Sequence, residues 1–195
     1  MASSLIATAV RSRPARSFAR WARRAVGIAL ACLVGLLGLL LYWSYPGKPQ
    51  PFLDERGRPL PGSIFEKISV PINGVDQAMI IKSRDAALPV LLYLHGGTPD
   101  YFLTQDYPTH LEDAFTVVWW DRRGAGLSYR VGIPPITLEQ LIADTLAVTD
   151  HLRHRFGQDK IYLLGHSEGT FIGIQVAARA PERYHAYIAV AQMAN

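Results

Sequence analysis

Residues 165–169 read GHSEG, a serine between two glycines, and lie between a short apolar run and a segment with helical spacing. A serine on a sharp turn from strand to helix presents its hydroxyl above the sheet, and flanking glycines let the backbone pass close by. We therefore expect Ser167 to be a catalytic nucleophile. The backbone N–H of Glu168 points into the same space and is expected to bind an oxyanion that develops there. A glycine-rich structural turn, formed with Gly165, His166 and Gly169, is the alternative interpretation.

A second glycine pair stands in His95-Gly96-Gly97, at the end of an earlier apolar run. In a parallel sheet the carboxyl ends of the strands lie along one edge, where ligands bind. We therefore expect this loop to reach the same edge as Ser167, with Gly97 as the second oxyanion N–H donor. His95 is expected to be structural rather than catalytic, packing or hydrogen bonding under the loop beside Gly96.

These loops must be positioned by the short apolar runs and helical patterns that alternate along the chain. One helix is expected to begin at Thr137, with a capping box to Gln140, and to end at Gly157. A small-residue helix follows Ser167 and stops before Pro181. Strands that alternate with helices indicate βαβ units and a parallel sheet, and so an α/β fold. The predicted strands cover residues 64–70, 77–82, 89–94, 115–120, 160–164 and 187–191.

The motifs HGG (residues 95–97), WWDRRGAGLS (119–128) and GHSEG (165–169) resemble, in this order and spacing, the α/β-hydrolase superfamily. Within it they are most similar to the proline iminopeptidase-like branch, over about residues 64–195. The resemblance implies an amide or ester bond cleaved through an acyl-enzyme on Ser167, a small-molecule or short-peptide substrate and no cofactor. An epoxide- or haloalkane-type hydrolase is disfavoured because those enzymes carry Asp at the elbow position. The resemblance also implies a loop beside the site, shaped by Asp121, Arg123, Gly124 and Gly126, in which the Asp and Arg pair or cap the turn.

Two departures from the branch pattern concern the oxyanion loop. HGG is followed by Thr98-Pro99-Asp100 in place of Pro-Gly, so this loop is expected to differ from that of the branch. Glu168 places a carboxylate beside the nucleophile, where it would disfavour an anionic substrate or bind a substrate amine.

The catalytic base and acid present a further departure. The superfamily places Asp or Glu and then His after the serine, whereas the candidates after Ser167 are His185, Glu182 and Glu168. The first two are expected on the far side of the sheet, and a serine without a base is a weak nucleophile. One hypothesis is therefore that the chain is the N-terminal part of a membrane-anchored serine hydrolase whose sheet is truncated after the sixth strand. This part alone is then expected to be inactive or nearly so. The other is a non-catalytic, membrane-anchored binding protein that retains the serine turn.

The charge distribution argues against a nucleic-acid partner. The chain has 195 residues and a net charge of +4, and its 49% hydrophobic and 18% charged residues exclude a disordered chain. Seven of the 20 basic residues precede the first acidic residue, Asp54, which leaves 13 basic against 16 acidic residues after residue 48.

The oligomeric state is left open, and the single cysteine, Cys32, precludes an intrachain disulfide and gives no metal cluster.

The basic residues belong to a predicted membrane anchor. The apolar run at residues 26–43 would span about 27 Å, close to the ~30 Å hydrocarbon core. Six arginines precede it, which predicts a cytoplasmic N-terminus and a domain on the opposite side of the membrane. A cleaved signal peptide, a lipoprotein signal at Cys32 and an organelle transit peptide are the alternatives. The expected segments are a basic region (1–24), a transmembrane helix (25–45), a linker (46–62) and an incomplete α/β-hydrolase domain (63–195).

Overall fold

The computed structural model describes residues 14–44, 52–98 and 109–193. The predicted segments lie partly outside these residues: residues 1–13 of the basic region, residue 45 of the transmembrane helix, residues 46–51 of the linker, and residues 99–108 and 194–195 of the hydrolase domain, including Pro99-Asp100 of the oxyanion loop. The chain divides into two compact units, Met1–Pro46 and Gly47–Asn195, and each is described by itself.

The first unit contains one long helix, α1 (Pro14–Ser44). It begins within the region expected to be basic, because proline suits the first turn of a helix and the alanines and arginines that follow are good helix formers. Its segment Phe18–Trp43 is long and apolar enough to cross a membrane, a criterion that a signal sequence also meets. By length and composition, α1 is therefore weak evidence for a membrane anchor.

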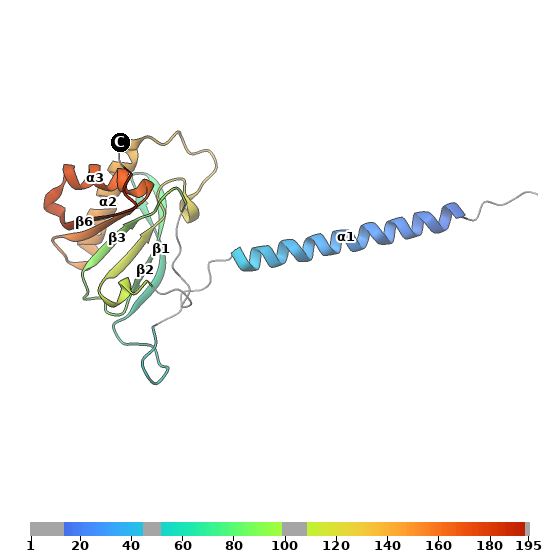
Figure 1. Ribbon diagram of the computed structural model, residues 1–195, viewed down its shortest axis with the longest axis horizontal. Helices are drawn as coiled ribbons and strands as arrows, with labels where there is room; N and C mark the ends of the chain where they lie inside the picture. The colour runs from blue at the N-terminus through green and yellow to red at the C-terminus, as the bar shows by residue number, and fades with distance from the viewer. Residues whose placement is uncertain (1–13, 45–51, 99–108, 194–195) are drawn as a thin grey trace, which may run out of the picture. The chain divides into compact units, whose positions relative to one another are not determined.

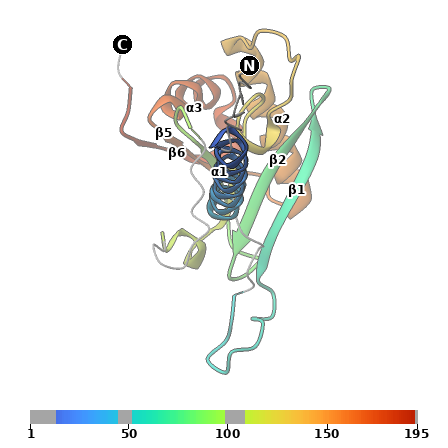
Figure 2. The ribbon, with the colours of Figure 1, turned by 90° about the vertical axis from the view of Figure 1, so that its right-hand side faces the viewer.

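The second unit is built on one six-stranded sheet with the order β1-β2-β4-β3-β5-β6. The hairpin β1–β2 occupies one edge and β6 the other (Figures 1 and 2). The β1–β2 and β2–β4 pairings are antiparallel, whereas β4, β3, β5 and β6 run parallel. The predicted α/β fold with a mostly parallel sheet is confirmed. The strands are β1 (Ile64–Ile72), β2 (Val75–Ser83), β3 (Val90–Leu94), β4 (Thr116–Trp120), β5 (Ile161–His166) and β6 (Tyr184–Val190).

Two helices, α2 (Leu138–Phe156) and α3 (Glu168–Arg179), cover one face of this sheet (Figure 1). Their apolar side chains form a buried core with residues of β2, β3, β4 and β5. The central strands β3 and β4 are buried on both faces, as expected of continuous apolar runs in parallel strands. The opposite face carries a smaller apolar cluster, and Leu111 and Leu127 pack against it. These two leucines belong to two short 3₁₀ segments, Leu111–Asp113 and Gly126–Ser128.

The ends of α2 show how the local sequence positions the helix. The Thr137 side chain accepts a hydrogen bond from the backbone N–H of Gln140, and Gly157 ends the helix in the left-handed conformation (φ 62°). The predicted capping box is only half formed, because the Gln140 side chain donates instead to Asp144 (3.0 Å). A buried carboxylate that needs donors therefore takes the side chain that would otherwise close the cap.

Candidate active site

Ser167 occupies the turn between β5 and α3 in a strained backbone conformation, with φ 50° and ψ −120°. Its neighbouring glycines are required by space. A Cβ on Gly165 would lie 2.8 Å from the Cα of Thr170, and one on Gly169 would lie 2.2 Å from the carbonyl oxygen of Leu94. Contacts this short are not tolerated between a side chain and rigid backbone, so the glycines allow β5, α3 and the end of β3 to meet at Ser167.

The loop after β3 lies directly against the serine. A Cβ on Gly96 would lie 3.3 Å from the Ser167 Cβ and 3.8 Å from its Oγ, and one on Gly97 would lie 3.6 Å from the Glu168 carboxylate. Gly96 is buried and Gly97 exposed. Glu168 begins α3, and N–H groups of the first helical turn have no acceptor within the helix. The two residues expected to supply oxyanion donors therefore lie on adjacent segments beside Ser167.

Arg122, which the sequence reasoning did not single out, joins these two segments. Its Nη2 donates to the Gly96 carbonyl (2.7 Å) and lies 3.7 Å from the Glu168 Oε2, and its Nε contacts His95 Nε2 at 3.3 Å. The side chain is buried although it is charged. Burial lowers the pKa of Arg122, and the nearby Glu168 carboxylate partly offsets this effect. The available sequence signal was a charged residue two positions after the end of a buried strand.

His95 is positioned beneath the oxyanion loop. It is buried, and its Nδ1 lies 2.7 Å from the Gly96 carbonyl oxygen. Because that carbonyl only accepts, Nδ1 carries the proton, which leaves Nε2 to accept from Arg122. His166 ends β5, and its ring lies 6.4 Å from that of Tyr93, between centroids.

The loop after β4 is held by backbone and side-chain hydrogen bonds. Asp121 Oδ2 accepts from the Leu127 N–H (2.6 Å), and the Ser128 hydroxyl donates to the Asp121 carbonyl (2.6 Å). Gly124 and Gly126 both have positive φ (77° and 44°), which glycine adopts without strain. Asp121 thus caps this turn.

Arg123 pairs with Asp144 of α2 rather than with the aspartate of its own loop. The Arg123 Nε and Nη2 donate to the two carboxylate oxygens of Asp144 at 2.8 and 3.1 Å. Asp144 is fully buried and also accepts from Asn73 and Gln77 (2.8 Å each). Burial raises the pKa of Asp144, but hydrogen bonds from Arg123 and the neighbouring amides outweigh it and hold the pKa below its usual 3.8.

The histidine and acid that follow Ser167 outside its own motif are distant from it. His185 belongs to the start of β6, whose first residue pairs with Ile161 at the beginning of β5, and its ring packs against Tyr162 (5.1 Å between centroids). Glu182 lies in the short segment Pro181–Arg183 just before β6. Ser167 follows the end of β5, so it lies at the opposite end of these parallel strands from His185. Within residues 14–44, 52–98 and 109–193, no imidazole or carboxylate is hydrogen bonded to the Ser167 hydroxyl.

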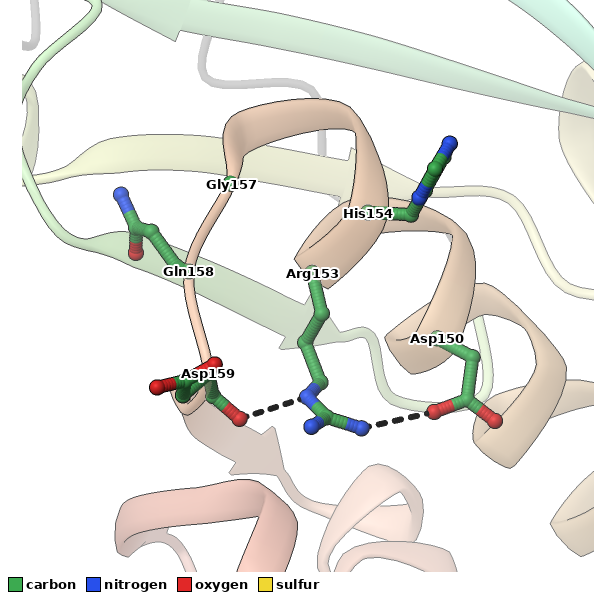
Figure 3. Close-up of a pocket in the computed structure, with 6 residues that line it drawn as sticks. All are labelled: Asp150, Arg153, His154, Gly157, Gln158 and Asp159. Carbon is green, nitrogen blue, oxygen red and sulfur yellow. Dashed lines mark hydrogen bonds and ion pairs between the residues drawn. The ribbon is translucent and has the colours of Figure 1, made fainter.

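A pocket of about 390 Å³ lies at the C-terminal end of α2 (Figure 3). Its lining residues precede β5, whereas Ser167 follows the end of that strand. Arg153 crosses it, donating to the Asp159 carbonyl (2.6 Å) and to Asp150 (3.0 Å). This pocket does not belong to the serine site. The part of the chain that the structure describes contains no group of three His, Cys, Asp or Glu residues able to hold a metal ion.

Several known proteins are similar in sequence to this chain. The chain is 38% identical over 137 residues to the probable aminopeptidase YbaC of Bacillus subtilis, covering 68% of this chain and 42% of that protein. It is 32% identical over 113 residues to the lysophosphatidylserine lipase ABHD12 of Gallus gallus, covering 56% of this chain and 29% of the lipase. The chain thus spans less than half the length of the curated relatives it matches.

Solved structures agree in fold. A proline iminopeptidase-related protein of Thermus thermophilus superimposes with a TM-score of 0.54 and 28% identity, covering 65% of this chain and 44% of that one. An epoxide hydrolase of Vigna radiata gives a TM-score of 0.54 and 26% identity, covering 64% and 39%. The family model for serine aminopeptidases, S33, matches residues 86–195, which include the HGG loop, the loop after β4 and the serine turn. The chain therefore belongs to the serine aminopeptidase (S33) family of α/β-hydrolases.

Proposed function

We propose that Ser167 is the nucleophile of a serine hydrolase that cleaves an amide or ester bond in a small molecule or short peptide, as an aminopeptidase does. The observation that carries this proposal is the strained backbone of Ser167 (φ 50°) on the turn between β5 and α3, with Gly96 packed against it. Strain at a single residue persists where surrounding structure enforces it, and it is typical of catalytic positions. The resemblance to a probable aminopeptidase favours the amide as substrate bond.

The proposed chemistry is a two-step acyl transfer. The Ser167 Oγ attacks the substrate carbonyl carbon while a base takes the hydroxyl proton, and the carbonyl oxygen becomes an oxyanion. The N–H groups of Gly97 and Glu168 stabilise that oxyanion, and the leaving amine or alcohol departs with the proton. Water then attacks the acyl-enzyme, which releases the acid and restores the serine.

We further propose that the 195-residue chain performs this reaction slowly. Among the described residues no histidine is hydrogen bonded to the Ser167 hydroxyl, and His185 lies at the opposite end of the parallel strands. Without a base the serine hydroxyl is a weak nucleophile at neutral pH. The oxyanion donors alone are expected to leave a small residual reactivity.

The proposed location is a membrane, with α1 as a single-pass anchor. The apolar length of Phe18–Trp43 supports this proposal, and the arginines that precede it favour a cytoplasmic N-terminus. The hydrolase domain would then act on the other side, and no nucleic-acid partner is proposed.

Capture of a fluorophosphonate probe tests the nucleophile directly. We expect slow labelling of the 195-residue chain, with the label on Ser167 and no labelling of Ser167→Ala. Ser63→Ala is the control and should label like the unchanged chain, because the Ser63 hydroxyl lies in the segment before β1 and donates to the Leu60 carbonyl (2.7 Å).

Three outcomes decide between the alternatives. Labelling of Ser167→Ala at the rate of the unchanged chain would overturn Ser167 as the nucleophile. Rapid labelling that depends on Ser167 would show that the chain contains its own base. Complete lack of labelling, with a folded domain by circular dichroism, would favour a non-catalytic, membrane-anchored binding protein.

A further inference from the structure

Arg122 makes its contacts where the two segments of the proposed oxyanion hole approach each other. Its guanidinium donates to the carbonyl of Gly96 on one segment (2.7 Å) and lies 3.7 Å from the carboxylate of Glu168 on the other. The Glu168 side chain is about half exposed, while that of Arg122 is 6% exposed. Arg122 is therefore the more constrained of the two side chains in this contact.

The Gly96 carbonyl belongs to the same peptide unit as the Gly97 N–H. In a planar trans peptide these two groups point in opposite directions, so fixing the carbonyl also fixes the direction of the N–H. Two consecutive glycines offer little intrinsic resistance to a rotation of this unit. Arg122 Nη2 and His95 Nδ1 both donate to the Gly96 carbonyl, each at 2.7 Å, and so hold it on the side away from the oxyanion.

Arg122 is itself held in place by its chain neighbours. Asp121 caps the turn through the Leu127 N–H (2.6 Å), and Arg123 is anchored to Asp144 of α2 (2.8 Å). Arg122, between these two anchored neighbours, has little freedom to move. Burial lowers the pKa of Arg122, and the Glu168 carboxylate partly offsets this effect. The loop after β4 thus presents a rigid donor to the loop after β3.

We propose that Arg122 is a positioning residue of the oxyanion hole: by holding the Gly96 carbonyl and the Glu168 carboxylate, it directs the Gly97 N–H toward the oxyanion and joins the two donor segments. This inference rests on the proposed function of Ser167 as nucleophile. Arg122 does not touch the substrate, and its effect passes through the Gly96–Gly97 peptide.

The test combines two measurements on the 195-residue chain and on its Arg122→Gln and Arg122→Lys variants. The first is the second-order rate of fluorophosphonate capture at Ser167. The second is the NMR resonance of the Gly97 amide in ¹⁵N-glycine-labelled protein, assigned by its loss in Gly97→Ala. For Arg122→Gln we expect a shifted or broadened Gly97 resonance and a labelling rate reduced by about tenfold. The reduction should be smaller than the roughly 10²–10³-fold cost of losing an oxyanion donor completely, because the Gly97 N–H is misdirected rather than removed. Arg122→Lys is expected to fall between, because lysine still donates to the Gly96 carbonyl.

Arg153→Gln is the matched control. Like Arg122, Arg153 donates to a backbone carbonyl and pairs with a carboxylate, but it does so at the far end of β5 (Figure 3). We expect both measurements to be unchanged in this variant. An unchanged Gly97 resonance in Arg122→Gln would overturn the proposal, as would a shifted resonance with an unchanged rate.

Two further outcomes separate this inference from the proposed function. If the unchanged chain is not labelled at all, the nucleophile proposal fails, and the Gly97 resonance alone then decides whether Arg122 positions the peptide. If Arg122→Gln does not fold, Arg122→Lys and Glu168→Gln replace it, because Glu168 is half exposed and its substitution spares the core. Unchanged values of both measurements in both of these variants would overturn the proposal.

Discussion

Arg123 and Asp144 form a buried, two-pronged ion pair that ties the loop after β4 to helix α2, with N–O distances of 2.8 and 3.1 Å. Asp144 also accepts hydrogen bonds from Asn73 and Gln77, and Arg123 donates to the Asn73 carbonyl (3.2 Å). The pair therefore unites the β1–β2 turn, the loop beside the proposed site and α2. Removing one partner would leave the other charge buried.

We expect Asp144→Asn to lower the free energy of unfolding by about 3–5 kcal/mol, because it leaves a buried guanidinium without its counter-charge. Denaturant unfolding of the purified chain measures this loss. Glu139→Gln, which breaks the exposed pair between Glu139 and Arg179, should lower the free energy of unfolding much less, because water screens a surface pair. Equal effects of the two substitutions would contradict the structural role assigned to Asp144.

The same carboxylate predicts a dependence of stability on acid. Because the folded-state pKa of Asp144 is below its usual 3.8, its contribution is fully present above pH 3.8 and is lost as the pH falls through the lower folded value. We expect the acid-induced loss of unfolding free energy below pH 4 to be smaller in Asp144→Asn. An identical acid profile in the two proteins would show that other carboxylates dominate.

Tyr184 predicts a change at the alkaline end. Its hydroxyl donates to Thr149 Oγ1 (2.8 Å), since that hydroxyl donates in turn to the Thr145 carbonyl. Burial raises the pKa of Tyr184 from 10.0 to about 12, so its stabilisation is complete below pH 10 and lost as the pH rises through 12. This amounts to about 2–3 kcal/mol, which unfolding at pH 9 and pH 11.5 should reveal. Tyr184→Phe should remove most of this slope, while Tyr129→Phe, at an exposed position, should retain it.

Ser167→Gly should stabilise the domain while abolishing labelling. The φ of 50° strains serine but not glycine, and relief of such strain contributes about 1–3 kcal/mol, partly offset by the greater chain entropy of glycine. Ser167→Ala keeps the Cβ, so it should lose labelling without the gain in stability. Equal unfolding free energies of the two variants would show that the turn is not strained.

Gly169→Ala tests the close approach of α3 to β3. The added Cβ would lie 2.2 Å from the Leu94 carbonyl oxygen and 2.7 Å from that of His95, so the helix must shift, at a cost of about 3 kcal/mol or more. Gly132→Ala is the control, since its φ is 81° but its Cβ would meet no atom, and about 1 kcal/mol is expected. Comparable melting temperatures for both variants would contradict the close packing.

Membrane insertion of α1 is checked by expression of the chain in cells. We expect it to remain in membranes after an alkaline carbonate wash, and its hydrolase domain to be digested by protease added on the side opposite the cytoplasm. Leu36→Arg with Leu37→Arg, which places charge in the apolar segment, should release the chain from the membrane fraction. A cleaved N-terminus in mass spectrometry would instead favour a signal peptide.

Local sequence features predicted most of the helices and strands, but not the order of the strands in the sheet. Continuous apolar runs predicted β3 and β4, because strands buried on both faces need no polar alternation. Thr137 and Gly157 marked the ends of α2, since the capping atoms lie within one turn of the chain. The resemblance of the three glycine-rich motifs to the α/β-hydrolase superfamily implied that fold, which the structural neighbours confirm.

Only the tertiary structure showed which charged groups meet. Arg123 pairs with Asp144, and Arg122 reaches Gly96 and Glu168, because β3, β4 and β5 lie side by side in the sheet although their loops are far apart in sequence. The half-formed cap at Gln140 depends on tertiary structure in another way: its partner Asp144 is only four residues away, but the burial of that carboxylate is decided by the packing of α2 on the sheet. Spacing along the chain determines local hydrogen bonds, whereas the donors that satisfy a buried charge are decided by the strand order that brings distant loops to one edge.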